Sequence, residues 1–285
     1  MNEAKEVKTA FPNGHFYSPV VDPSTVGDYL ERRWKDKIDD LKGIGIDLEG
    51  MRGFWTDNLD FIKSCTFPQV QTDTHRYYFN CGFYGPGDGT ILRTMIRVHR
   101  PRRIIEIGSG FSTACALDTI DELQLRKSIQ ITCIEPYPER LEKLLRASDR
   151  DVVSVLRQAV QAVDLSLFSE LQANDILFID STHVLKTGSD VHFELFYILP
   201  CLKPGVLIHF HDIHFPFEYP RQWIYDRNFS WNEVYALRAF LSYNNSFRIL
   251  FYNDLFARAE RTLVEQTYPY FLINPGGALW MTRLG

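Results

Sequence analysis

The stretch "IIEIGSGFST", residues 104–113, decides the fold of this chain. A run of aliphatic residues typical of a buried strand is followed at once by Gly108 and Gly110, and then by a segment of helical character. Glycines in such a turn let the backbone approach a ligand closely, and the start of the helix offers unpaired N–H groups. This order predicts a ligand-binding edge in an α/β sheet. A tight turn alone would also explain so short a glycine pattern.

Strands and helices alternate on both sides of this turn. Apolar runs predict strands at residues 102–108, 129–136, 152–158, 175–181 and 205–212, with helical patterns between them. Such alternation is typical of a parallel sheet covered on both faces. Residues 247–254 and 277–285 predict two more strands with no full helical pattern between them, so we expect these two strands to pair antiparallel.

Composition places the chain among ordinary globular proteins. It has 285 residues, 45% of them hydrophobic, and a net charge of -5, which does not favour nucleic acid as a partner. No stretch approaches the roughly 18 apolar residues of a membrane span, and the N-terminal residues lack the apolar core of a secretion signal. The five cysteines are scattered without a Cys-x-x-Cys pair. We therefore expect a soluble, cytoplasmic protein of the size of an enzyme, with no nucleic-acid or membrane partner.

The N-terminal part differs from the rest. We expect residues 1–75 to form an extension or cap and residues 76–285 to form the main domain. Within the extension, Ser24 is a candidate helix cap, and residues 51–65 have the pattern of one amphipathic helix. The extension would cover a ligand pocket of its own subunit or, in a homo-oligomer, that of a partner.

Two residues beside the glycine turn bear on the cofactor. Glu135 closes the second strand, where an acid can accept hydrogen bonds from both ribose hydroxyls. Thr113 stands where a dinucleotide fingerprint has glycine or alanine, which argues against NAD and FAD. Glu106, at the end of the first strand, suits a ligand that carries a cation or an amine.

The motifs resemble those of a known family. "IIEIGSGFST", "CIEPYP" and "ILFIDSTH" are similar to the first, second and fourth motifs of class I S-adenosylmethionine-dependent methyltransferases, in particular the small-molecule enzymes of methyltransferase family 24. The resemblance covers roughly residues 75–285. It implies a Rossmann-like sheet of seven strands with an antiparallel last strand, S-adenosylmethionine as cofactor, and methyl transfer as the activity.

The resemblance also implies a cofactor site. Glu106, Gly108 and Gly110 would surround the methionine part, Glu135 would hold the ribose, and Gln161 would lie near the adenine. The full set of predicted cofactor residues is Glu106, Gly108, Ser109, Gly110, Ser112, Glu135, Gln161, Asp180 and Ser181.

Polar side chains gather at the predicted ends of the fourth and fifth strands, in "FIDSTH" and "IHFHDIH". One interpretation is a divalent metal held by Asp180, Asp212 and His214, with the histidine favouring a transition metal over Mg²⁺. A second is general base catalysis, with His183, His211 and Asp212 as the catalytic residues. The third is a set of satisfied polar groups at a strand end, which is the expectation for His209.

Aromatic residues supply candidate walls for the acceptor pocket. Residues 215–231 form a long segment with many aromatics and no evident secondary structure, which is typical of a lid. The predicted substrate-binding residues are Tyr17, Tyr84, His214, Tyr219 and Trp223.

Methylation of a hydroxyl group is the leading functional prediction, since that acceptor must lose a proton and this strand end offers bases. N-methylation by the same fold is the alternative within the class. An NAD(P)-dependent oxidoreductase and a binding protein without turnover are alternatives from other classes. A serine hydrolase is excluded, because "GSGFS" lacks the Gly-x-Ser-x-Gly order.

Overall fold

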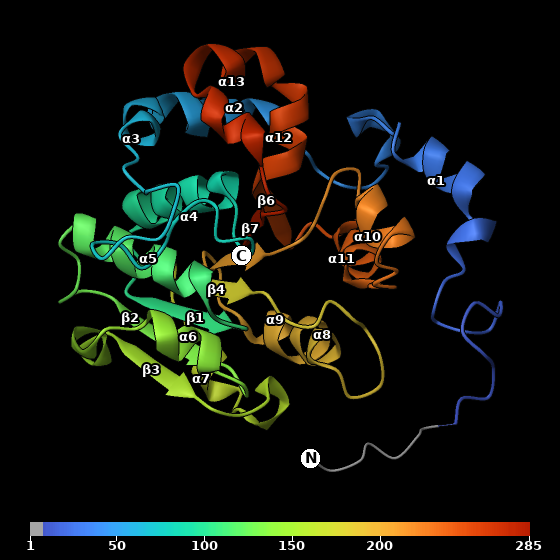
Figure 1. Ribbon diagram of the computed structural model, residues 1–285, viewed down its shortest axis with the longest axis horizontal. Coiled ribbons are helices and arrows are strands. Elements are labelled where there is room, and N and C mark those ends of the chain that lie inside the picture. The colour runs from blue at the N-terminus through green and yellow to red at the C-terminus, as the bar shows by residue number, and fades with distance from the viewer. Residues whose placement is uncertain (1–7) are drawn as a thin grey trace.

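The computed structural model describes residues 8–285 and contains a seven-stranded sheet in the order β3-β2-β1-β4-β5-β7-β6 (Figure 1). The pairs within β3-β2-β1-β4-β5 are parallel, whereas β7 runs antiparallel to β5 and β6. This is the predicted class I methyltransferase topology. The strands are β1 (Arg103–Ile107), β2 (Gln130–Ile134), β3 (Val153–Leu156), β4 (Ile176–Ile179), β5 (Leu207–Phe210), β6 (Phe247–Tyr252) and β7 (Leu279–Arg283).

Helices cover both faces of this sheet. In Figure 1, α4 and α5 lie on one side and α8 and α9 on the other, because right-handed crossovers leave β1 and β4 in opposite directions. The helices are α1 (Gly27–Arg33), α2 (Leu48–Asp57), α3 (Leu59–Lys63), α4 (Pro86–His99), α5 (Phe111–Glu122), α6 (Glu139–Leu144), α7 (Ser166–Ser169), α8 (Asp190–Phe193), α9 (Leu199–Cys201), α10 (Arg221–Tyr225), α11 (Glu233–Leu241), α12 (Asn253–Ala259) and α13 (Arg261–Thr267). A π-helical turn at Glu194–Ile198 joins α8 to α9.

The order of strands creates an opening at the β1/β4 boundary. Chain connections run from β1 outward to β2 on one side and from β4 outward to β5 on the other. The turns after these strands therefore diverge and leave a crevice at their carboxyl ends, which is where open α/β sheets bind ligands. The first two cavities described below lie along this edge.

Several local predictions were wrong. The segment between the last two strands contains α12 and α13, which the apolar pattern did not reveal because α13 buries only Val264. The segment 215–231 contains the short helix α10. Residues 51–63 belong to two helices divided at Asn58, and the predicted single helix over 51–65 is wrong. The cap near Ser24 is Asp22, whose Oδ1 accepts the N–H of Ser24 at 3.0 Å.

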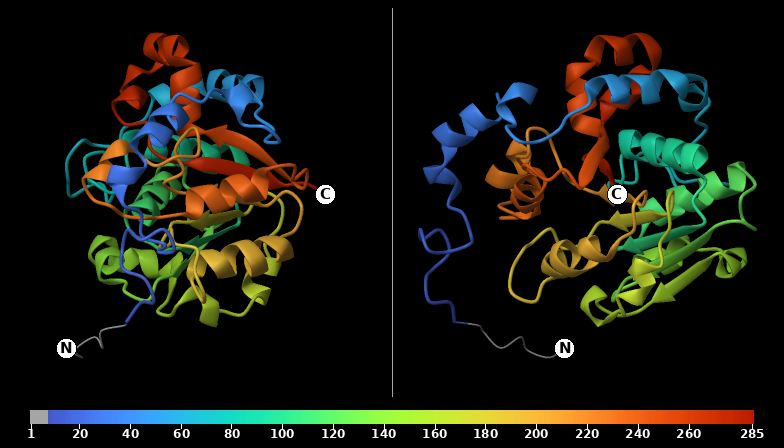
Figure 2. Two further views of the ribbon diagram at one scale, coloured as in Figure 1. Left: turned by 90° about the vertical axis from the view of Figure 1, so that its right-hand side faces the viewer. Right: turned by 180° about the vertical axis from the view of Figure 1, so that it is seen from behind.

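The described N-terminal residues pack against the rest of the chain, through α2 and through the segment before it. Trp55 of α2 is fully buried, and its ring lies 5.2 Å from those of Phe256 and Phe271. Residues 8–34, which we call the arm, run past α10 and α11 (Figure 2). Within the described residues 8–285, none of the helices combines the length and apolar composition needed to span a bilayer.

Candidate active site

The turn after β1 requires glycine at its first position. Gly108 has a φ of +75°, and a Cβ atom placed on it would lie 1.8 Å from the carbonyl oxygen of Asp180. The backbone after β1 therefore touches the backbone after β4, because no side chain stands between them. Gly110 starts α5, so the turn presents the first N–H groups of that helix to the crevice.

A cavity of about 490 Å³ lies beside this turn. Among the predicted cofactor residues, its lining includes Gly108, Glu135, Gln161, Asp180 and Ser181. Glu135 Oε2 accepts the N–H of Ser109 at 3.2 Å, and Oε1 accepts that of Tyr137 at 2.8 Å. The cavity thus joins the turns after β1, β2, β3 and β4, and we call it the cofactor cavity.

The remaining predicted cofactor residues do not line this cavity. Ser109 and Gly110 continue the turn behind it, and Ser112 bonds to Glu106. Glu106 is only 2% exposed, and its carboxyl accepts hydrogen bonds from the hydroxyls of Ser112 and Thr113. Burial raises the pKa of Glu106 to about 8, so at neutral pH it is mostly a neutral carboxylic acid inside the turn. Lys186 and Asp190 line the cavity and were not among the predicted cofactor residues.

At the ends of β4 and β5, one imidazole lies among three carboxyl groups. His183 Nε2 is 3.5 Å from Asp180 Oδ1 and 3.6 Å from Asp212 Oδ2. On the other side of the ring, Nδ1 is hydrogen-bonded to Glu233 Oε2 at 2.8 Å. Burial disfavours the charged ring, but the contacts with Asp180 and Glu233 and the charge of Asp212 raise the pKa of His183 well above its ordinary value. His183 is therefore held as a cation between carboxylates.

The backbone at both strand ends adopts an uncommon conformation. His183 has a φ of +60° and Asp212 a φ of +58°, and neither residue is glycine. Left-handed backbone of this kind costs free energy and persists only where the surroundings enforce it. Here it lets the turns after two neighbouring strands direct their side chains toward each other.

A second cavity, of about 330 Å³, lies on the other side of Asp212. Its walls include Tyr84, Asp88, His211, Asp212 and Trp223, and we call it the polar cavity. His211 Nε2 lies 3.4 Å from Asp212 Oδ1. Burial again opposes the charged ring, but the charges of Asp212, Asp180 and Asp88 raise the pKa of His211 to about 9. Asp212 thus faces the cavity between two protonated imidazoles.

Asp88 belongs to this cluster and was not predicted from the sequence. It is 2% exposed and accepts hydrogen bonds from Asn253 Nδ2 at 3.2 Å and from the N–H of Ala278 at 3.1 Å. Burial raises the pKa of Asp88 to about 7, and the charge of His211 opposes that rise. The only sequence signal was an acid in the first turn of the helix before β1, a position that ordinary helix capping also explains.

Two comparisons with other proteins bear on this site. A family model described as a methyltransferase domain, that of family 24, matches residues 105–213. An uncharacterised protein of Archaeoglobus fulgidus is 34% identical over 178 residues, which make up 60% of this chain and 78% of that protein. The chain belongs to this methyltransferase family. It is an S-adenosylmethionine-dependent methyltransferase, as the sequence predicted, and not an NAD(P)-dependent oxidoreductase.

Solved structures of methyltransferases resemble this one distantly. SAH-bound methyltransferase PaMTH1 of Podospora anserina is 12% identical with a TM-score of 0.43, over 98% of this chain and 100% of that one. A structure titled CmcI-D160 with Mg and SAM is 18% identical with a TM-score of 0.40, over 80% of this chain and 84% of that one. Similarities this low assign neither an acceptor nor a metal to the methyltransferase described here.

The predicted metal ligands of the methyltransferase are not gathered at one point. His214 Nδ1 lies 3.9 Å from Asp254 Oδ2, and its ring packs against Trp223, whereas His183 occupies the space between Asp180 and Asp212. In the described part of the chain, no group of three or more His, Cys, Asp or Glu side chains is arranged to hold a metal ion. As they stand, these residues do not fit a bound metal.

The other predicted residues of the methyltransferase fall in different surroundings. Tyr84 is buried and its ring lies 5.3 Å from that of His211. Tyr219 and Trp223 line a third cavity beside the arm. Tyr17 is 68% exposed on the arm and lines none of these cavities. His209 is fully buried and stacks on Phe178, but neither ring nitrogen has a hydrogen-bond partner among the described residues, so it is not the satisfied group expected.

Proposed function

We propose that this methyltransferase transfers the methyl group of S-adenosylmethionine to a hydroxyl group of a small molecule. The observation that carries the proposal is the position of Asp212, between His183 and His211 and on the wall of the polar cavity. A hydroxyl acceptor must release its proton as it attacks the methyl group, and a carboxylate within hydrogen-bond reach can receive that proton.

The two cavities divide the reactants between them. We assign the cofactor to the cavity at the glycine turn, where Glu135 suits the ribose and where Asp180 and Ser181 also line the wall. The acceptor would enter the polar cavity, with its hydroxyl group on Asp212 and its oxygen directed toward the methyl group of the cofactor. Holding the two reactants in line supplies much of the rate of such a transfer.

In the reaction that we propose, the acceptor oxygen forms a bond to the methyl carbon while the bond from that carbon to sulfur breaks. The hydroxyl proton passes to Asp212, and the electron pair of the broken bond stays on sulfur. His183 and His211 act as positioning residues, because their raised pKa values keep them protonated and able to donate hydrogen bonds to Asp212. This differs from a mechanism in which either histidine takes the proton.

The domain division fits this scheme. We propose that residues 76–285 hold the cofactor and the reacting groups, and that residues 1–75 contribute to the acceptor side, because the arm contacts the segment that follows β5. Trp34 Nε1 donates a hydrogen bond to the carbonyl oxygen of Tyr219 at 3.0 Å, and Asn228 Nδ2 donates to that of Val21 at 3.2 Å.

A calorimetric titration tests the proposal. Chelator-treated protein is titrated with S-adenosylmethionine, with and without added Mg²⁺ or Mn²⁺. We expect saturable binding that the metals do not change. Absence of binding would contradict the cofactor site, and binding that requires a metal would contradict the role given to Asp212.

A screen of acceptors tests the chemistry. Phenols and catechols, some of which also carry an amino group, are incubated with isotopically labelled cofactor beside their fully O-methylated ethers, and the position of the label is found by mass spectrometry. We expect label on oxygen and none on the ethers. Label on the nitrogen of an amine-bearing compound would replace O-methylation by N-methylation.

A further inference from the structure

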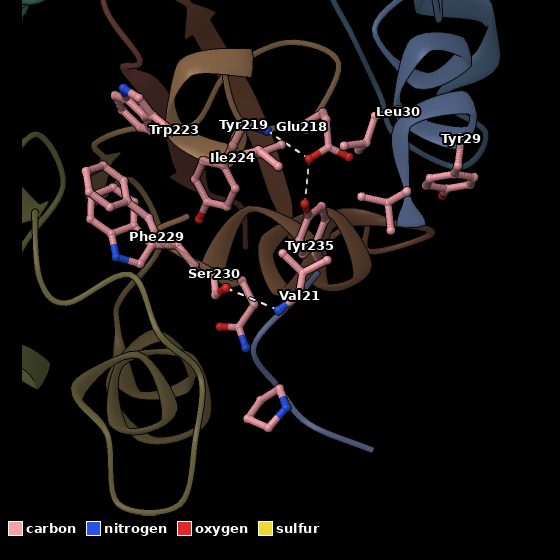
Figure 3. A pocket seen from close by; sticks show the side chains of 14 residues that line it. Val21, Tyr29, Leu30, Glu218, Tyr219, Trp223, Ile224, Phe229, Ser230 and Tyr235 are labelled. Carbon is pink, nitrogen blue, oxygen red and sulfur yellow. Dashed lines mark hydrogen bonds between the residues drawn. The ribbon is translucent and has the colours of Figure 1, made fainter. Parts of the chain in front are cut away.

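A third cavity, of about 340 Å³, lies between the arm and the segment 218–235 (Figure 3). The arm contributes Val21, Tyr29 and Leu30, and the facing wall is aromatic, formed chiefly by Tyr219, Trp223 and Phe229. We call it the arm cavity.

The arm is fixed to the opposite wall by specific contacts. Ser230 Oγ accepts the N–H of Val21 at 3.2 Å, and the carbonyl oxygen of Tyr219 accepts the indole N–H of Trp34 at 3.0 Å. Arg221 pairs with Glu31 and lies 4.4 Å above the ring of Trp34. These contacts hold the arm against residues 219–230, so the arm forms a fixed wall of the cavity.

One carboxyl group stands in this mainly apolar lining. Glu218 is 5% exposed, and its Oε1 accepts hydrogen bonds from the hydroxyl of Tyr235 and from the N–H of Tyr219 (Figure 3). Its Oε2 has no hydrogen-bond partner among residues 8–285, yet it is not sealed from solvent, and Glu218 lines the cavity. A carboxylate oxygen that no group of the protein bonds, on the wall of a cavity, can accept a hydrogen bond from a ligand that brings a donor.

The chemistry of the lining selects the ligand. Tyr219 lies 6.1 Å from Trp223, and Trp223 lies 5.9 Å from Phe229, so flat aromatic faces follow one another along the wall. Such faces bind rings and also attract cations. An ammonium group satisfies both features, because it forms a charge-assisted hydrogen bond with a carboxylate and interacts favourably with aromatic faces.

The cavity also adjoins the candidate active site. Trp223 lines both the arm cavity and the polar cavity that contains Asp212. Trp231 is another wall residue, and its ring lies 4.5 Å from that of His183. A molecule bound in the arm cavity therefore lies beside the groups that hold Asp212.

We propose that the arm cavity binds the amine-bearing aromatic end of the acceptor, with its ammonium group on Glu218 and its ring against Tyr219 and Trp223. This rests on the proposed function, because it makes the occupant part of the methyl acceptor. It names the acceptor as an alkylamine that carries an aromatic ring, with a hydroxyl group at some distance from the nitrogen.

Binding of small probes to the full chain tests the assignment without turnover. Phenethylamine and 2-phenylethanol have the same ring and chain and differ in the terminal group. Each is titrated against the protein by ligand-observed NMR. We expect the amine to bind about tenfold more tightly than the alcohol, as charge-assisted bonds exceed neutral ones. Equal affinities, or no binding of either probe, would overturn the proposal.

Substitutions locate the site. Glu218→Gln should remove the tenfold preference and leave the alcohol unaffected, whereas the matched change Glu265→Gln, in the ion pair with Arg261 on α13, should leave both affinities as they were. As a second probe of the same site, Ile224→Trp should fill the cavity and abolish binding of both compounds. Thermal melting shows that each variant is folded. Retention of the preference in Glu218→Gln would overturn the assignment.

The same variants separate this inference from the proposed function. We expect Glu218→Gln to bind S-adenosylmethionine as the parent does, because Glu218 does not line the cofactor cavity. If the parent protein does not bind S-adenosylmethionine, the proposed function is contradicted. If the parent binds the cofactor but does not prefer phenethylamine to 2-phenylethanol, only the role given to the arm cavity is contradicted.

Discussion

The cofactor cavity and the arm cavity are built in different ways. The cofactor cavity is lined by turns that follow neighbouring parallel strands, and all its lining residues lie between Ile107 and Asp190. The arm cavity joins residues 19–30 to residues 218–235, which are far apart in the chain. Short sequence motifs therefore specify the first cavity, whereas the second depends on how the arm packs against the rest of the chain.

A buried carboxyl group near each of these two cavities shows the same contrast. Both oxygens of Glu106 are bonded by hydroxyls from the start of the next helix, and the group stabilises a turn. Glu218 has one bonded oxygen and one facing a cavity. The first arrangement is complete without a ligand, and the second is not.

The largest effect should come from Asp212. We expect Asp212→Asn to lower turnover by about 10²- to 10⁴-fold, the usual contribution of a general base, while cofactor affinity changes only a few-fold. Turnover is measured with an acceptor from the screen, and affinity by calorimetry. The control is Asp226→Asn, which changes an exposed acid in the segment that follows β5. Comparable turnover in the two variants would remove the end of β5 from the mechanism.

Glu106 should affect stability in a pH-dependent way. Its pKa rises from 4.5 to about 8 on folding, so the folded chain binds more protons than the unfolded chain between these values, and stability falls as pH increases through that window. Glu106→Gln has no such proton. Between pH 5 and pH 8, the free energy of unfolding of Glu106→Gln should therefore rise by about 2–4 kcal/mol relative to that of the parent. Denaturant unfolding at both pH values measures this, and parallel pH dependences would show that Glu106 is ionised.

A substitution of Glu135 should affect ligand binding in the cofactor cavity and not in the arm cavity. We expect Glu135→Ala to weaken S-adenosylmethionine binding by about 1–3 kcal/mol, the cost of leaving polar partners unmade, and to leave phenethylamine binding unchanged. Glu139→Gln, an exposed acid at the start of α6, is the control. Unchanged cofactor affinity in Glu135→Ala would undo the placement of the ribose.

The smallest effect should come from Trp34. Trp34→Phe removes the indole N–H that donates a hydrogen bond to the carbonyl oxygen of Tyr219. This bond should contribute about 1 kcal/mol to the attachment of the arm. We expect weaker phenethylamine binding by a few-fold, with cofactor affinity unaltered. An equal loss in both affinities would mean that the arm supports the whole molecule rather than the acceptor side.

The sequence predicted the sheet and the glycine turn because each depends on residues adjacent in the chain. It also indicated that the ends of β4 and β5 would meet, since neighbouring parallel strands end at the same edge. It did not identify Glu233 as the partner of His183, because α11 begins 50 residues later and its first acid resembles any helix start. Asp88 escaped for the same reason. Its buried position depends on Gly276, where a Cβ atom would lie 1.9 Å from Asp88 Oδ2.

The connection between His183 and α11 sets a rule for redesign. The carbonyl oxygen of His183 accepts the N–H groups of both Asn232 and Glu233, each at 3.1 Å, and the ring of His183 bonds to the Glu233 side chain. A chimera made to change acceptor preference can therefore exchange residues 220–230 for those of a relative. It must retain Asn232 and Glu233, because a graft that shifts their register would displace the histidine.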